Sequence, residues 1–411
     1  MLHGTSRRCD TVLAVLSYQQ ALECLLRIVQ PLAAERLLLT AAAGRTLAAA
    51  VVAPHPMPPF DQSLMDGYAV RSSDTRIATA NRPVLLPLVY TLTAGESLRS
   101  PLAPRQAIRI MTGAPLPAGA DAVIKLEDGE VQGQNLVIRQ PLPGGVYIQR
   151  RGAEIRRHTV VVRAGERLTP QRTGLALALG LERVEVTRRP RIAFVAPGDE
   201  LLPPGAPLQP GKKWCSNLYA LAMRAQELGA TSVDLGIVPD TLEALTSSLQ
   251  QGLASDAVVL LGASGRGDHD FAGRAMATIG AEMLLQGVAM NPGRSIAVAR
   301  HRHTLFFGLP GSPWAAFIGF EVFIRPALRA MLGQPSPPPI AAVLTTTVQV
   351  RRGVTHFLPA RLRQSADGWE ATPLSDLLSI AQLESHPIGL IPVLPHRRQL
   401  SRGARVRVHL L

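Results

Sequence analysis

A glycine-rich segment at residues 308–313 (GLPGSP) is the clearest candidate for binding an anion. It follows a short apolar run and precedes a long apolar segment, as a loop between a strand and a helix does. Ser312 suits the position that caps a helix, and the glycines would let main-chain amides approach a phosphate closely. A well-capped helix without a ligand is the alternative. We predict a phosphate-binding loop whose binding residues are Gly308, Pro310, Gly311 and Ser312.

A second loop, residues 262–270 (GASGRGDHD), ends in the two carboxylates Asp268 and Asp270. It follows the apolar run 257–261, which has the length of a buried strand. Mg²⁺ is usually held by one or two carboxylates together with substrate phosphates, and these aspartates fit that role. A solvated acidic turn, or a helix cap by Asp270, is the alternative interpretation.

Two more carboxylates follow predicted strands. Glu200 lies in residues 198–201 (GDEL) after the run 192–196, and Asp240 follows the run 232–237. Because the carboxyl ends of parallel strands share one edge of a sheet, we expect these groups to gather there. Together they predict a metal or phosphoryl-transfer site, although each alone could cap a helix.

Several common catalytic motifs do not occur in the sequence. It contains no Walker P-loop, no GxGxxG, no HExxH and no paired-cysteine zinc spacing. This disfavours classical ATPases, dehydrogenases and zinc hydrolases. Cys215 has no histidine near it in sequence, so we expect a small buried side chain rather than a nucleophile.

The elements that must position these loops alternate between strand and helix from residue 189 to 333, which predicts a mostly parallel sheet covered by helices. Apolar spacing predicts two helices within residues 17–52, the second Ala-rich, and another helix over 168–181. Between them lie short β-like runs at 84–90, 107–111 and 122–126.

The expected fold class is therefore α/β and β multidomain. The proline-rich stretch 334–339 predicts a linker. It separates the last of four predicted domains, which are a discontinuous helical domain (17–57 and 146–185), an inserted β-rich domain (58–145), an α/β domain (186–333) and a C-terminal β domain (340–411).

Composition limits the partners and the compartment. The formal net charge of +13 comes almost entirely from scattered arginines, and aromatic residues make up 4%, so small anions are favoured over nucleic acid. The chain has three cysteines and no CxxC, which suits a reducing cytoplasm. The longest apolar stretch, 37–52, is interrupted by Gly44 and Arg45, so we expect no membrane span.

Five motifs in order resemble the molybdopterin molybdenumtransferase family over nearly the whole chain. The most specific is residues 58–69 (PPFDQSLMDGYA), close to the family's PPFDNSAMDGYA. The others are residues 109–115 (RIMTGAP), 198–201 (GDEL), 235–237 (LGI) and 308–311 (GLPG).

This resemblance implies a homodimer of four-domain chains ending in a β barrel, with each active site shared between two subunits. It implies catalytic roles for Asp66, Thr112, Glu200 and Asp240, with Mg²⁺ held by Glu200, Asp268 and Asp270. The implied substrates are adenylated molybdopterin and molybdate, and AMP is released. A molybdopterin adenylyltransferase and target molybdoenzymes are implied as possible partners.

The sequence departs from the family pattern at two anion-binding segments. Where the family reads SGGVSVG, residues 261–267 read LGASGRG, leaving Ser264 and Arg266 as the candidate binding residues. Where the family reads KPGKP, residues 291–295 read NPGRS, so Arg294 replaces a lysine with a wider, planar cation. A non-catalytic relative that binds cofactor as a scaffold is the alternative, and an adenylyltransferase relative is a weaker one.

Overall fold

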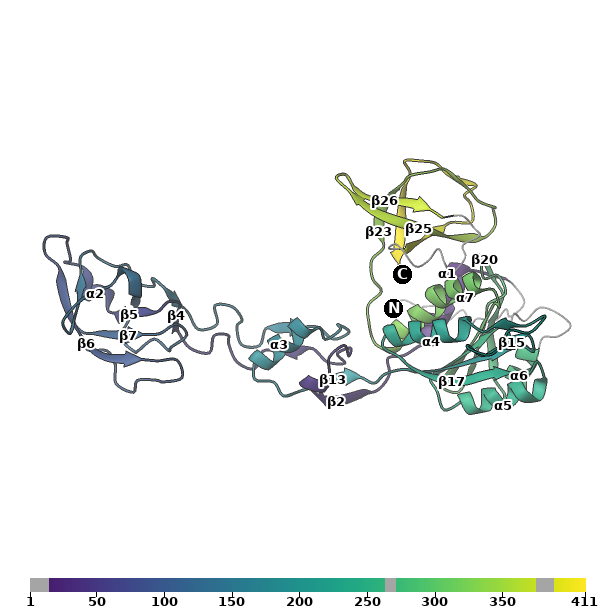
Figure 1. Cartoon of the computed structure of the whole chain (residues 1–411), viewed down its shortest axis with the longest axis horizontal. Coiled ribbons are helices and arrows are strands. Elements are labelled where there is room, and N and C mark those ends of the chain that lie inside the picture. Colours follow the sequence, from purple (N-terminus) through teal and green to yellow (C-terminus); the bar gives the residue numbers. More distant parts are fainter. Residues whose placement is uncertain (1–14, 263–270, 375–387) are drawn as a thin grey trace, which may run out of the picture.

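The computed structural model describes residues 15–262, 271–374 and 388–411. The chain is elongated, with a β-rich insert at one end, a narrow connecting module around α3 in the middle, and an α/β unit with a barrel beside it at the other end (Figure 1). Within the described ranges, no helix is long and apolar enough to cross a membrane.

A six-stranded mixed sheet forms the centre of the α/β unit. Its order is β17-β14-β18-β22-β21-β19; the first four strands are parallel to one another, and β21 pairs antiparallel with both β22 and β19. The bounds are β14 (Arg191–Pro197), β17 (Thr231–Val238), β18 (Ala257–Leu261), β19 (Glu282–Gln286), β21 (Ala297–His301) and β22 (Thr304–Leu309). The predicted parallel strands are confirmed.

Helices cover both faces of this sheet because its strands are apolar on both faces. In β14, Ile192 and Phe194 pack into one hydrophobic cluster, whereas Ala193 and Val195 pack into another. The first cluster includes side chains of α1 (Tyr18–Ile28), α4 (Asn217–Glu227), α7 (Pro313–Gly319), a π-helical turn η3 (Phe320–Ile324) and α8 (Arg325–Met331). The second includes side chains of α5 (Leu242–Gly252) and α6 (Phe271–Thr278).

The second helix predicted within residues 17–52 is wrong. This segment forms β2 (Ala34–Leu38), a short 3-10 turn η1 (Leu39–Ala41) and β3 (Val51–Val52). β2 pairs with β13 (Arg183–Thr187) and β3 with β12 (Val160–Val162). Gly44, between β2 and β3, has a φ of 75°, which would interrupt a helix. The long-range pairings of β2 and β3 outweigh the helix propensity of the alanines. The helix predicted over 168–181 is present as α3 (Pro170–Ala178).

The insert is β-rich, as predicted. Its sheet has the order β8-β5-β7-β6-β10-β9. The strands are β5 (Gly67–Val70), β6 (Val84–Leu92), β7 (Ala107–Ile110), β8 (Ala122–Lys125), β9 (Glu130–Gln132) and β10 (Asn135–Ile138), with a short helix α2 (Ser72–Thr75), a 3-10 turn η2 (Leu126–Asp128) and a bridging pair β4 (Gln62–Ser63) and β11 (Ile148–Gln149).

The C-terminal part is a closed five-stranded barrel, which confirms the all-β expectation. Its strands run β25-β26-β23-β29-β27, and a β25–β27 pairing closes the circle. The bounds are β23 (Ile340–Leu344), β25 (Thr355–Ser365), β26 (Gly368–Pro373), β27 (Ile388–Val393) and β29 (Arg405–Leu410), with a side pair β24 (Val348–Gln349) and β28 (Gln399–Leu400). The barrel sheet is extended by two further strands: β20 (Val288–Asn291) pairs with β25, and β1 (Leu16–Ser17) pairs with β20.

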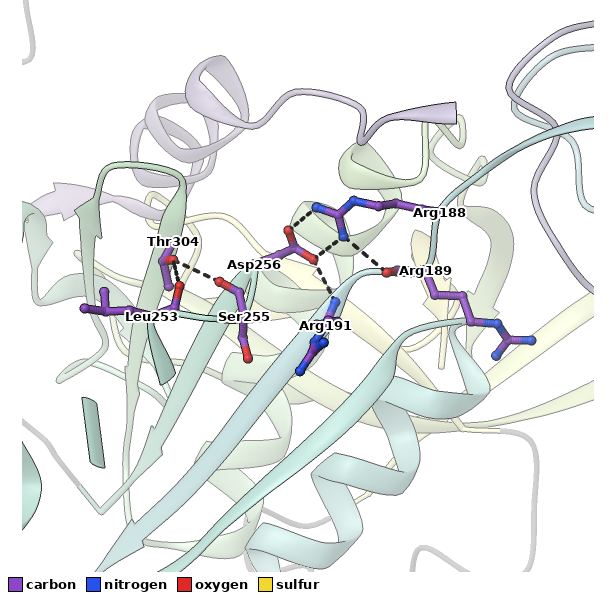
Figure 2. A network of polar contacts seen from close by, with 7 residues as sticks. All are labelled: Arg188, Arg189, Arg191, Leu253, Ser255, Asp256 and Thr304. Atoms are coloured by element: carbon purple, nitrogen blue, oxygen red, sulfur yellow. Dashed lines mark hydrogen bonds and ion pairs between the residues drawn. The ribbon is translucent and has the colours of Figure 1, made fainter. Parts of the chain in front are cut away.

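An ion pair fixes the chain where it passes from the connecting module into β14. Two nitrogens of the Arg188 guanidinium lie 2.8 and 2.5 Å from the carboxylate oxygens of Asp256 (Figure 2). The main-chain amide of Arg191 donates to the same carboxylate at 2.8 Å. Such a bidentate pair has defined geometry, so it orients the start of β14 against the segment before β18.

Candidate functional site

A cavity of about 100 Å³ lies where loops after three parallel strands meet. The amide of Gly262, after β18, donates to the carbonyl of Leu309 at 3.0 Å. The side-chain amide of Asn217, at the start of α4, donates to the carbonyl of Gly311 at 2.9 Å. These hydrogen bonds bring the ends of β18 and β22 and the beginning of α4 to one edge of the sheet. This is expected, because the carboxyl ends of parallel strands share one edge.

Glycines keep this edge open. A side chain at Gly311 would place its Cβ 3.4 Å from the Cα of Gly262. Of the predicted loop residues, Gly311 lines the cavity, whereas Gly308 is buried within β22 and Pro310 is half-buried outside the lining. Ser312 occupies the cap position of α7, but its side chain makes none of the capping hydrogen bonds that we expected. Its hydroxyl is therefore not used by the helix.

Glu200 lines the cavity and forms an ion pair there with a lysine. Its carboxylate lies 3.1 Å from Nζ of Lys213. The two residues are neighbours because β15 (Leu201–Leu202) pairs with β16 (Lys213–Trp214). Partial burial alone would raise the pKa of Glu200, but hydrogen bonds from its own main chain and from Lys213 hold that pKa below its usual value. The cavity thus has a carboxylate and an ammonium at its rim.

The other predicted carboxylate of this edge is close but lies outside the cavity lining. Asp240 follows β17, and its amide donates to the carboxylate of Asp199 at 3.4 Å. Asp199 also accepts a hydrogen bond at its carbonyl from the side chain of Lys212. Asp240 therefore lies beside Asp199, which precedes Glu200 in the chain, but of the two predicted carboxylates Glu200 lines the cavity and Asp240 does not.

In the insert, the structure brings together the two residues that the motifs single out. Oδ1 of Asp66 accepts hydrogen bonds from both the amide and the hydroxyl of Thr112, each at 2.7 Å. The hydrogen bond from the main-chain amide of Thr112, and then the one from its hydroxyl, lower the pKa of Asp66. Both side chains are exposed. The next residue after Asp66 is Gly67, and no side chain fits there because a Cβ would lie 1.8 Å from the carbonyl oxygen of Ile124.

Arg294 is exposed and does not line the cavity. Its carbonyl accepts a hydrogen bond from Val288 at 2.9 Å, and Asn291, at the end of β20, contacts a ring nitrogen of His356 at 3.2 Å. Four other predicted site residues lie outside the described residues; these are Ser264, Arg266, Asp268 and Asp270. Within the described ranges, no group of three or more His, Cys, Asp or Glu side chains is arranged to hold a metal ion.

Sequence reasoning missed Lys213 and Asn217, which both line the cavity. A signal was present, because the chain has only three lysines and two of them are adjacent at 212–213. Cys215 behaves as expected: it is 3% exposed, and desolvation raises the pKa of its thiol.

Two family models match successive parts of this chain. Residues 16–180 match the family model of the MoeA N-terminal region (domains I and II), and residues 193–330 match that of a probable molybdopterin-binding domain. Molybdopterin molybdenumtransferase 2 of Mycobacterium tuberculosis is 36% identical over 86% of this chain and 88% of its own length. The molybdopterin molybdenumtransferase of Bacillus subtilis is 34% identical over 80% and 78%.

A solved structure supports the same conclusion. The molybdopterin biosynthesis MoeA protein from Pyrococcus horikosii superposes with a TM-score of 0.85 at 30% identity, over 97% of this chain and 99% of that one. Fold and matches together define a multidomain protein of the molybdopterin-binding class. The chain belongs to the molybdopterin molybdenumtransferase family, a family of transferases, and has a role in molybdenum cofactor biosynthesis. The scaffold alternative receives no support from these relatives.

Proposed function

We propose that this protein inserts molybdenum from molybdate into adenylated molybdopterin and releases AMP. The observation that supports this most directly is the strand-end cavity, where a lysine, an asparagine and glycine-rich loops surround one carboxylate. AMP is released by hydrolysis: the oxygen of a water molecule bonds to one phosphorus while the phosphoanhydride bond between the pterin phosphate and the adenylate breaks, and the proton of that water passes to solvent. Negative charge then develops on the leaving phosphate, and a preorganised cation such as Lys213 stabilises it.

Mg²⁺ is the proposed metal. Glu200 suits it because the side chain is 45% exposed at the cavity, and one or two carboxylates plus substrate phosphates are a usual magnesium environment. Asp268 and Asp270 are its other proposed ligands. The ion would neutralise phosphate charge when bound.

We propose that the active site is shared between two subunits of a homodimer. Asp66 and Thr112 belong to the insert, whereas the Glu200 cavity belongs to the α/β unit at the opposite end of the same chain (Figure 1). One chain therefore does not bring both groups to one substrate. A second copy whose insert reaches the α/β unit of the first would do so.

We also propose the four domain boundaries stated above, a cytoplasmic location, and a molybdopterin adenylyltransferase and target molybdoenzymes as partners. The direct test of function uses the purified chain with adenylated molybdopterin, Mg²⁺ and molybdate, and follows AMP by chromatography. Molybdate-dependent release of AMP is the expected result. No release at any molybdate concentration, from a folded protein, would contradict the proposal.

A further inference from the structure

A second and larger cavity, of about 260 Å³, lies at the junction of the connecting module and the α/β unit. It shares no lining residue with the Glu200 cavity. Both modules contribute to its wall, and they meet closely there: a Cβ at Gly165 would lie 2.5 Å from the carbonyl oxygen of Gly333. The side-chain amide of Gln334 donates to the hydroxyl of Thr46 at 2.7 Å. The junction is therefore a packed interface around an open cavity.

The charged residues that line this cavity are mostly arginines. They are Arg45, Arg167, Arg189, Arg329, Glu166 and Glu227. Both glutamates are already neutralised by arginines outside the lining: Glu166 by Arg172 at 2.8 Å and Glu227 by Arg224 at 2.9 Å. The negative charges in the wall therefore do not offset its arginines.

Among the residues that the structure describes, only one of the four lining arginines has a carboxylate partner. Arg45 pairs with Glu35, which does not line the cavity. Arg167 donates from Nε to the carbonyl of Gly44 at 3.0 Å. In the part of the chain that the structure describes, the guanidinium of Arg189 makes no hydrogen bond or ion pair, and Figure 2 shows it pointing away from Asp256.

Arg329 provides the strongest observation. Its Nε is buried and has no hydrogen-bond partner among the described residues, while its Nη1 donates to the carbonyl of Pro335 at 3.1 Å. The nearby buried carboxylate, Glu321, is occupied by Arg224 and Arg325, each at 2.7 Å. Burial, and then the charge of Arg325, lower the pKa of Arg329. A buried donor without an acceptor is costly, so an oxyanion here would relieve it.

We propose that this junction cavity binds a small dianionic oxyanion of the phosphate class. Planar guanidinium groups present paired donors that match phosphate oxygens, and uncompensated arginines in a concave site attract such ions. The volume admits a free inorganic ion or the phosphate group of a small ester. Because the wall comes from two modules, the bound anion holds the connecting module against the α/β unit.

The test is isothermal titration of inorganic phosphate into the full-length protein in chloride buffer, with a parallel titration of AMP. We expect saturable binding that Arg189→Gln and Arg329→Gln each weaken about tenfold, since each removes a charge-assisted bond. Because Arg189 is exposed, we expect Arg189→Gln to stay folded even if Arg329→Gln does not fold. Arg99→Gln removes the same charge from an exposed position in the insert and should leave binding unchanged.

Because AMP is also the proposed product at the Glu200 cavity, only the binding that Arg189→Gln weakens reports on the junction cavity. For that binding, equal affinity for phosphate and AMP would identify a free ion as the ligand, and tighter binding of AMP would identify a phosphate ester. Absence of saturable binding, or binding that Arg189→Gln leaves intact, would overturn the proposal. So would a result in which the arginine variants weaken self-association in sedimentation while phosphate never binds, because the cavity would then be filled by a second copy.

Discussion

The hydrogen bonds between Asp66 and Thr112 use one carboxylate oxygen of Asp66 and leave the other available to a ligand. Both hydrogen bonds from Thr112 reach Oδ1, and within the described residues no hydrogen bond reaches Oδ2. Because these bonds lower the pKa of Asp66, the group stays ionised near neutral pH. It is therefore suited to accept hydrogen bonds or contact a cation rather than to donate a proton.

We expect Asp66→Ala to reduce the rate of AMP release by about a hundredfold or more, as loss of a charged group at a transition state does. The side chain is exposed, so the free energy of unfolding should change by less than about 0.5 kcal/mol. Thr112→Val keeps the main-chain bond and should lose less activity. AMP release and thermal unfolding measure the two effects, and unchanged turnover in Asp66→Ala would remove this residue from the site.

Lys213 should control the pH dependence of the reaction through Glu200. The bond to Lys213 helps to keep the pKa of Glu200 low, so the carboxylate remains ionised until the pH falls well into the acid range. In Lys213→Ala that pKa rises, and the acid limb of the rate of AMP release should move to higher pH. Lys212→Ala, which affects Glu200 only through longer-range charge, should move it less. An acid limb that stays in place would show that Glu200 does not set it.

At the residue scale, sequence predicted the groups that follow strands and missed those that depend on pairing. Glu200 and Gly311 reach the cavity because parallel strands end at one edge, which is a local rule. Lys213 reaches it through the short β15–β16 pairing, and Asn217 through a bond to Gly311. Neither contact has a local signature.

At the scale of elements, buried strands and amphipathic helices were predictable because their apolar spacing is local. β18 begins and ends at the predicted residues, 257 and 261. Apolar spacing also predicts helices over residues 218–228 and 242–253, and the ends of α4 and α5 differ from these by one residue at most. β2 was not predictable, because its alanine and leucine residues suit a helix and only the distant β13 makes it a strand.

Gly67 is expected to be indispensable to the insert's sheet. β5 lies between β7 and β8, and a Cβ at this position would collide with the carbonyl of Ile124 at 1.8 Å. Gly67→Ala should therefore destabilise the insert by about 1–3 kcal/mol, seen as a lower Tm in calorimetry. Gly174→Ala is the matched control: Gly174 is exposed in α3 with open space around it, so alanine should stabilise by up to about 1 kcal/mol. Equal effects of the two changes would refute this explanation.

At the scale of the whole molecule, the order of the parts followed from the sequence but their placement did not. Composition and motifs predicted an insert, an α/β unit and a final β domain, and the barrel closes through the β25–β27 pairing. The distance between insert and α/β unit depends on the connecting module, where β2 was mistaken for helix. Without the geometry of the connecting module, sequence alone gives no physical reason why Asp66 and Glu200 of one chain should belong to different active sites.

Their separation leads to a test that does not depend on either residue's exact role. Asp66→Ala and Glu200→Ala should each keep about a hundredth of the activity or less when alone, because every site in a shared-site homodimer of either variant lacks one group. When the two proteins are mixed and allowed to exchange subunits, about half of the dimers become mixed. Each mixed dimer then has one site with both groups intact, so activity should recover to about a quarter of the wild-type value.

The control for this experiment is the double variant Asp66→Ala/Glu200→Ala mixed with either single variant. No combination of these chains contains an intact site, so activity should remain at background. Mass photometry of the same samples should show dimers throughout. If the two single variants exchange subunits and still show no recovery, both groups must be needed from the same chain. The opposite-end arrangement in Figure 1 would then have to rearrange during the reaction.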